Sequence, residues 1–111
     1  MKQIVKRYYR VIARNYRKNW GEIDIIAEKD GVLHFIEVKT VGHRFYEAGD
    51  EYSPEDNVHP WKLQRLSKAI QTYLMENDIE DEKPWQVDVA AIFLDLERKT
   101  ATIRMTFDVG L

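Results

Sequence analysis

The feature that most constrains this chain is a pair of apolar, alternating segments joined by Asp30-Gly31. Residues 21–29 read GEIDIIAEK, and residues 32–40 read VLHFIEVKT. A type I′ turn needs positive φ at both central positions, so Asp-Gly between two such segments is a strong β-hairpin signal. We therefore predict two antiparallel strands whose register is set by this turn.

That register places Asp24 opposite Glu37 and Glu22 opposite Lys39. Because side chains alternate between the two faces of a strand, these four share one face. Two carboxylates directly opposite each other repel, and a divalent cation would compensate, since Mg²⁺ is commonly held by one or two carboxylates and water. An ammonium on the same face suits polarising an attacking water or neutralising charge on a phosphorane. The hairpin thus predicts metal-assisted phosphodiester hydrolysis.

The opposite face of the hairpin is predicted to join the core through Ile23, Ile25, Ile36 and Val38.

A simpler interpretation of the same residues stays open. Lys39 can neutralise Glu22 in a surface ion pair worth about 0 to 1 kcal/mol, with Asp24 solvated on an open face. Asp followed by Glu-X-Lys uses common residue types, so only the hairpin register favours the catalytic interpretation.

Composition narrows the class of protein. With 111 residues, 44% of them hydrophobic, the chain is the size of one domain, residues 1–111. The absence of cysteine excludes disulfides, thiolate metal sites and a cysteine nucleophile. No apolar run approaches the roughly 20 residues of a membrane span, and no signal peptide is evident, so we predict a cytoplasmic protein with no membrane partner.

Charge is distributed unevenly along the chain. Seven basic residues precede the first acidic residue, Glu22, whereas the remainder carries 10 basic and 19 acidic residues. A basic segment beside an acidic body can guide a polyanion toward a carboxylate metal site, although a solvated N-terminal surface explains the same pattern.

The remaining pattern predicts two helices and three further strands. Pro60 suits a first helical turn, and the following residues place apolar side chains at helical spacing, with Lys62, Arg65 and Lys68 along a flanking face. The predicted order is (α)βββαββ, a mixed sheet with helices added. The expected elements are a short helix at 1–9, a strand at 9–15, a turn at 15–21, the hairpin, a long polar connection at 41–59, the helix at 60–77, an acidic link at 77–84, and strands at 85–96 and 100–107.

Four segments together resemble a known family. RNYRKNWGEIDIIA, FIEVKT, KLQRLSKAIQTYL and VDVAAI, spanning about Arg10 to Ile92, are similar to the YraN-like family of uncharacterised predicted endonucleases. That family resembles archaeal Holliday-junction resolvases within the PD-(D/E)XK nuclease superfamily. The resemblance implies a restriction-endonuclease-like α/β fold with a mixed central sheet flanked by helices.

The resemblance also implies roles for individual residues. Asp24 matches the metal-binding aspartate, Glu37 and Lys39 match the second motif, and Glu22 matches the Gly-Glu-X-Asp pattern. Mg²⁺ or Mn²⁺ is expected on Asp24, Glu37 and the carbonyl of Val38. Phosphate contacts are expected from Arg10, Arg14, Arg17, Lys62 and Arg65, of which Lys62 and Arg65 match a basic pair in the family's long helix.

Two departures from the family pattern bear on activity. Family members carry a Gly-Glu pair on an N-terminal helix, and this sequence has no acidic residue before Glu22, so that ligand is expected to be missing. The family's EVKTR is EVKTV here, with Val41 in place of a basic residue and Arg44 close by.

The sequence therefore predicts an endonuclease that acts on DNA, including branched or structured DNA by analogy with the resolvases. Chemistry on two strands would favour a symmetric homodimer. Two rivals remain: a nucleic-acid-binding module of the same fold without cleavage, and a partner-binding domain with no nucleic-acid contact. Trp20 and Trp61 suit either packing or stacking on unpaired bases, and Asp88 suits anchoring a neighbouring backbone group.

Overall fold

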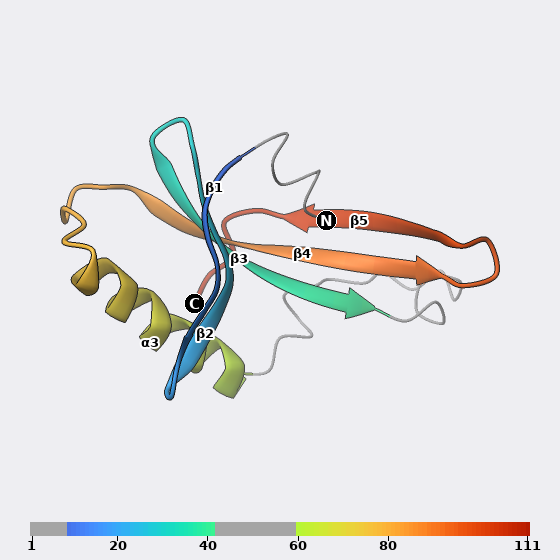
Figure 1. Ribbon diagram of the computed structural model, residues 1–111, viewed down its shortest axis with the longest axis horizontal. Helices are drawn as coiled ribbons and strands as arrows, with labels where there is room; N and C mark the ends of the chain where they lie inside the picture. The colour runs from blue at the N-terminus through green and yellow to red at the C-terminus, as the bar shows by residue number, and fades with distance from the viewer. Residues whose placement is uncertain (1–8, 42–59) are drawn as a thin grey trace.

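A computed structural model describes residues 9–41 and 60–111 of the chain. They form a five-stranded sheet and one helix, in an order that confirms the predicted βββαββ arrangement (Figure 1). The predicted helix at 1–9 and connection at 41–59 fall largely outside the described residues. The elements are β1 (Arg10–Lys18), β2 (Gly21–Lys29), β3 (Val32–Val41), α3 (Pro60–Glu76), β4 (Trp85–Asp95) and β5 (Thr100–Thr106).

The sheet is mixed, as predicted. Its strand order is β1-β2-β3-β4-β5, with β3 and β4 parallel and the other neighbours antiparallel. Parallel neighbours need a crossover connection, which α3 supplies between β3 and β4. Figure 1 shows α3 lying against the β1–β2 part of the sheet, while β4 and β5 run on as a long hairpin away from it.

The central hairpin has the predicted register. Ile25 pairs with Ile36, and the pairing continues to Lys29 and Val32 beside the turn. Asp30 and Gly31 have φ angles of 51° and 79°, as a type I′ turn requires. The turn chemistry therefore fixes which residues of β2 and β3 are neighbours.

The predicted end of the first strand is wrong. β1 continues to Lys18 instead of stopping at residue 15, and only Asn19 and Trp20 form the turn into β2. Asn15, predicted to start a turn, lies inside the strand with a φ of 52°. Asparagine tolerates this left-handed conformation better than most residues, so the strand kinks there and then continues.

The predicted core face of β2 is wrong at one end. Ile23 packs with Ile26 in the cluster beneath α3, whereas Ile25 packs with Ile36 on the other side of the sheet. Residues three apart cannot share a face in a regular strand, so alternation breaks between Ile23 and Ile25. Asp24 lies at this break, between the paired positions Arg14–Ile25 and Tyr16–Ile23 that flank the kink at Asn15 in β1.

The core beneath α3 explains why the helix sits where it does. Leu66, Ile70 and Tyr73 recur at helical spacing and are buried against Ile23 and Phe35.

None of the helical residues that the structure describes forms a segment long and apolar enough to cross a membrane.

Asp88 on β4 has the anchoring role that its sequence suggested. It is fully buried, and its Oδ1 accepts hydrogen bonds from the Asp108 backbone N–H at 3.0 Å and from Gln86 at 2.8 Å. Its Oδ2 lies 2.6 Å from Nδ1 of the buried His34 on β3. Asp88 therefore ties β3 and the C-terminal segment to β4.

Gly21 allows α3 to approach β2 closely. A Cβ at this position would meet the backbone carbonyl oxygen of Arg65 at a distance that real Cβ atoms do not reach. Backbone cannot rotate away as a side chain can, so a larger residue must push the strand and the helix apart.

We predict that Gly21→Ala lowers the free energy of unfolding by about 1 to 3 kcal/mol, the usual cost of overpacking. Urea denaturation monitored by circular dichroism measures this value. Gly110→Ala is the matched control, because a Cβ there has no heavy atom within 4 Å. Equal stability of the two variants would contradict the close helix–strand contact.

Candidate metal and nucleic-acid site

The candidate site lies where β2 and β3 separate. Their pairing ends at Ile25–Ile36, and beyond that point Oδ2 of Asp24 accepts a hydrogen bond from the Val38 N–H at 2.8 Å. A strand N–H needs a partner, and the Asp24 carboxylate takes the place of the backbone carbonyl that a continued ladder would provide. The break in β2 thus turns Asp24 toward β3.

Val38 brings a second oxygen to the same edge. In an antiparallel ladder, the N–H and C=O of one residue point toward the same neighbouring strand. Because the Val38 N–H points to Asp24, its carbonyl also lies on the β2 side of β3. This carbonyl is the ligand that the resemblance assigned to Val38.

Glu37 lies beneath the first turn of α3. It shares its face of β3 with Leu33 and Phe35, which form part of the core under the helix. Its side chain is only 5% exposed, and Oε1 accepts an ion-paired hydrogen bond from Nζ of Lys62 at 2.6 Å. A buried carboxylate needs such a partner, which α3 supplies.

The pKa of Glu37 is raised from 4.5 to about 6. Burial is the main cause, the hydrogen bond from Lys62 opposes it, and the negative charge of Asp24 and a hydrogen bond with it raise the pKa further. The predicted proximity of Asp24 and Glu37 is therefore present in the fold.

The two lysines beside these carboxylates have pKa values shifted in opposite directions. Burial lowers the pKa of Lys39, the charge of Lys62 lowers it further, and Glu37 opposes both. The hydrogen bond to Glu37 raises the pKa of Lys62, and the charges of Glu37, Asp24 and Glu22 add to this effect against burial. Lys39 is the ammonium that holds its proton less firmly.

A pocket of about 260 Å³ opens between the start of α3 and the strands. Its lining combines acidic, basic, aromatic and apolar side chains: Glu22, Glu37, Trp61, Lys62, Arg65 and Leu66. The sequence did not predict that Trp61 and Glu37 line one pocket. Helical periodicity places Trp61 on the helix but does not say which strand its first turn meets.

Glu22 lies at the exposed rim of this pocket. It forms an ion pair with Arg17 of β1 across 3.4 Å, both side chains being more than half exposed. Such a pair contributes about 0 to 1 kcal/mol and can rearrange. Glu22 is thus placed to contact a ligand through water.

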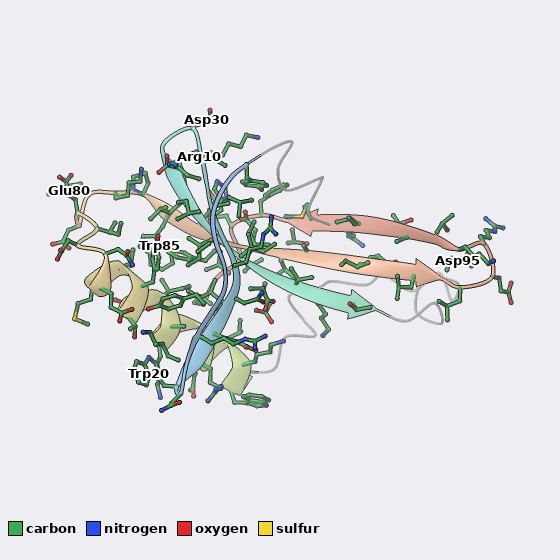
Figure 2. The ribbon with its side chains drawn as sticks, viewed as in Figure 1. Arg10, Trp20, Asp30, Glu80, Trp85 and Asp95 are labelled. Carbon is green, nitrogen blue, oxygen red and sulfur yellow. The ribbon has the colours of Figure 1, made fainter. Side chains whose placement is uncertain are left out.

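The predicted phosphate contacts divide into two groups. Lys62 and Arg65 line the pocket beside Glu37. Arg10 pairs with Glu28 at 2.9 Å, near the Asp30 end of the hairpin (Figure 2). Within residues 9–41 and 60–111, Arg14 makes no ion pair.

The donor set suits a hard cation that retains water. Within the described part of the chain, no three residues among His, Cys, Asp and Glu gather into a metal-binding group. Two carboxylates and a carbonyl are nevertheless the ligand number and type with which proteins hold Mg²⁺, whose other ligands are water or substrate oxygens. The residues present therefore fit Mg²⁺ or Mn²⁺, with Asp24 and Glu37 as the charged ligands.

Comparison with known proteins identifies related sequences. Residues 1–92 match the model of a family described as "Uncharacterised protein family UPF0102". A UPF0102 protein of Wolinella succinogenes is 45% identical over 71 residues, which are 64% of this chain and 58% of that protein. A UPF0102 protein of Nitratiruptor is 36% identical over 77% of this chain and 67% of its own length. One from Campylobacter jejuni is 34% identical over 86% of this chain and 77% of its own length. The chain thus spans little more than half of the Wolinella relative.

We predict that Glu37→Gln stabilises the protein at neutral pH. A folded-state pKa of about 6 against an ordinary 4.5 means that the native state favours protonated Glu37. This contribution is fully present below pH 4.5 and is lost as the pH rises through 6, which costs about 1 to 2 kcal/mol above that range. Glutamine removes the penalty.

Urea denaturation of wild type and Glu37→Gln between pH 4 and pH 8 measures this effect. The stability difference should grow between about pH 4.5 and pH 6 and then stay constant. Glu80→Gln, in the exposed link after α3, controls for the change in net charge. A difference that does not vary with pH would show that Glu37 is not the titrating group.

Proposed function

The chain belongs to the uncharacterised protein family UPF0102, and we propose that it is a metal-dependent endonuclease that hydrolyses phosphodiester bonds in DNA. One observation carries this proposal: Asp24, Glu37 and Lys39 converge where β2 and β3 separate. Carboxylates, a backbone carbonyl and an ammonium beside a pocket are what metal-assisted hydrolysis requires. Branched or structured DNA is the substrate suggested by the resemblance to resolvases.

Asp24, Glu37 and the Val38 carbonyl would hold the metal ion. A divalent cation supplies Lewis-acid polarisation of a phosphate oxygen when bound there. Lys62 now neutralises Glu37 across 2.6 Å, so its ammonium must leave that carboxylate before Glu37 can serve as a ligand. Asp24 already points into the gap between the strands, where the Val38 N–H holds it in place.

Lys39 is proposed to orient the attacking water and to stabilise the charge that develops on the phosphoryl group. It lies two residues after Glu37 and so on the same face of β3. Partial burial and the nearby Lys62 lower its pKa, which makes its proton easier to transfer. An ammonium fixed beside developing charge also needs little reorganisation during reaction.

DNA would approach over the basic side chains around the pocket. Lys62, once released from Glu37, and Arg65 would contact phosphates next to the reacting bond. Arg10, Arg14 and Arg17 on β1 would contact the backbone farther away. Such contacts release counterions, so binding would weaken steeply with salt.

The Lys62–Glu37 pair also favours a second candidate, a nucleic-acid-binding module without cleavage. The buried carboxylate is already satisfied by an ammonium and needs no metal ion for stability. Such a module would bind DNA in a salt-sensitive way and give no product in any metal.

We predict Mg²⁺- or Mn²⁺-dependent cleavage of single-stranded, duplex or four-way-junction DNA by the wild-type protein, abolished by EDTA. Asp24→Asn, Glu37→Gln and Lys39→Ala should each lower the rate by about 100-fold or more, because each removes a group that acts on the reacting phosphate. Glu28→Gln is the control, since Glu28 lies on the same strand as Asp24 and pairs with Arg10 and Lys83. Binding without cleavage in every metal would favour the second candidate.

We predict that Lys62→Met tightens Mn²⁺ binding to the DNA-free protein about fivefold at pH 8, because the metal ion no longer competes with an ammonium. The Lys62 end of this ion pair is 42% exposed, so we expect its loss to be worth about 1 kcal/mol. Isothermal titration calorimetry measures the affinity. Lys68→Met, on the same helix but outside the pocket, should leave it unchanged. Unchanged or weaker binding by Lys62→Met would show that Glu37 and Lys62 do not compete for the metal.

A further inference from the structure

We propose that the first two turns of α3 form a subsite for an unpaired nucleotide of the DNA, with Trp61 stacking on the base and Arg65 contacting its phosphate. This inference rests on the proposed nuclease function. It names a feature of the substrate that neither the metal site nor the family assigns.

The exposure and position of Trp61 support a stacking role. Trp61 is 56% exposed, although helices usually bury so large an aromatic ring. A single exposed aromatic residue needs no explanation by itself. Trp61, however, lines the same pocket as Glu37 and directly precedes Lys62, which contacts that carboxylate. An aromatic surface therefore lies at the edge of the candidate site.

The volume of the pocket suits one small flat group. At about 260 Å³ and open to solvent, it lies below the roughly 300 to 1,000 Å³ usual for pockets that enclose whole small molecules. Leu66 is part of its lining and is almost fully buried. One planar base fits this space better than a complete small-molecule ligand does.

Charges around the pocket suit a phosphate next to that base. Arg65 is exposed and, among the residues placed by the structure, makes no ion pair. Its guanidinium can form two parallel hydrogen bonds with phosphate oxygens. Lys62 lies within the same lining, so two cations border the pocket beside the carboxylates.

The occupant should be an unpaired nucleotide. In a duplex both faces of a base are covered by its neighbours, so a tryptophan ring can reach only a base that is unstacked or single-stranded. Such bases occur in single strands, in overhangs and at junctions. The subsite would then place a phosphate beside an unpaired base close to Asp24 and Glu37.

Trp20 offers a matched comparison. It is 44% exposed, yet it does not line the pocket, and its Nε1 donates a hydrogen bond to Thr72 at 2.8 Å, farther along α3. Figure 2 shows Trp20 at the opposite end of the β1–β2 pair from Asp30. It supplies the same ring outside the pocket that Glu37 and Arg65 line.

Fluorescence anisotropy in EDTA, with labelled single-stranded and blunt duplex oligonucleotides, tests the subsite without cleavage. Trp61→Ala should weaken single-strand binding about tenfold, within the range found for loss of one stacking contact, and should leave duplex binding within twofold. Trp61→Phe should retain most of the affinity. Trp20→Phe should bind both oligonucleotides as wild type does, and Arg65→Gln should weaken binding and reduce its salt dependence.

The outcomes separate this inference from the proposed function. Wild-type single-strand affinity in Trp61→Ala, or equal losses on both oligonucleotides, would overturn the subsite. In that case, metal-dependent cleavage lost in Asp24→Asn would still support the nuclease. If the wild-type protein neither binds nor cleaves either oligonucleotide, both proposals fail.

Discussion

The candidate site depends on the hydrogen bond that the Val38 N–H donates to Asp24. β2 and β3 are held in register by the Asp-Gly turn, yet their ladder ends at Ile25–Ile36. The gap beyond that pair is where an acidic side chain can replace a backbone partner. In a regular ladder the Val38 N–H would bond to the backbone of β2, and the Asp24 side chain would lie over the face of the sheet instead of accepting this bond. The local break in β2, beside the kink at Asn15 in β1, therefore positions the chemistry.

α3 completes the site and lowers the free-energy cost of burying the Glu37 carboxylate. Glu37 is buried beneath the helix, and burial raises its pKa, so the ionised form destabilises the fold near neutral pH. Lys62 lowers this cost by pairing with the carboxylate. The helix can reach Glu37 because Gly21 lets it pack directly on β2. The electrostatics of the site therefore depend on the close packing of α3 on β2.

The sequence predicted the parts of the fold that local chemistry determines. Asp30-Gly31 gave the hairpin register, Pro60 and the apolar spacing gave α3, and the order of strands followed from the apolar segments. Tertiary geometry decided the rest. A strand that continues through a left-handed Asn15 looks like a turn, because asparagine is also a turn residue. The change of face between Ile23 and Ile25 is equally hidden, because both residues are isoleucine and both are buried.

The same limit applies to the candidate site. The hairpin brought Asp24, Glu37 and Lys39 together in advance, because register depends on the turn alone. The ion pair of Lys62 with Glu37 depends on where α3 packs against the sheet, and so does the exposure of Trp61. Both follow from packing between elements far apart in the sequence, which periodicity within one helix does not report.

The most direct test of the account is the anomalous-scattering map of a protein crystal soaked in Mn²⁺. We predict one peak between the carboxylates of Asp24 and Glu37, about 2.1 Å from their oxygens as for a Mg²⁺-type site, with the Lys62 ammonium moved away from Glu37. A crystal that binds Mn²⁺ elsewhere, or that shows Lys62 still paired with Glu37 and no peak at Asp24, would contradict it.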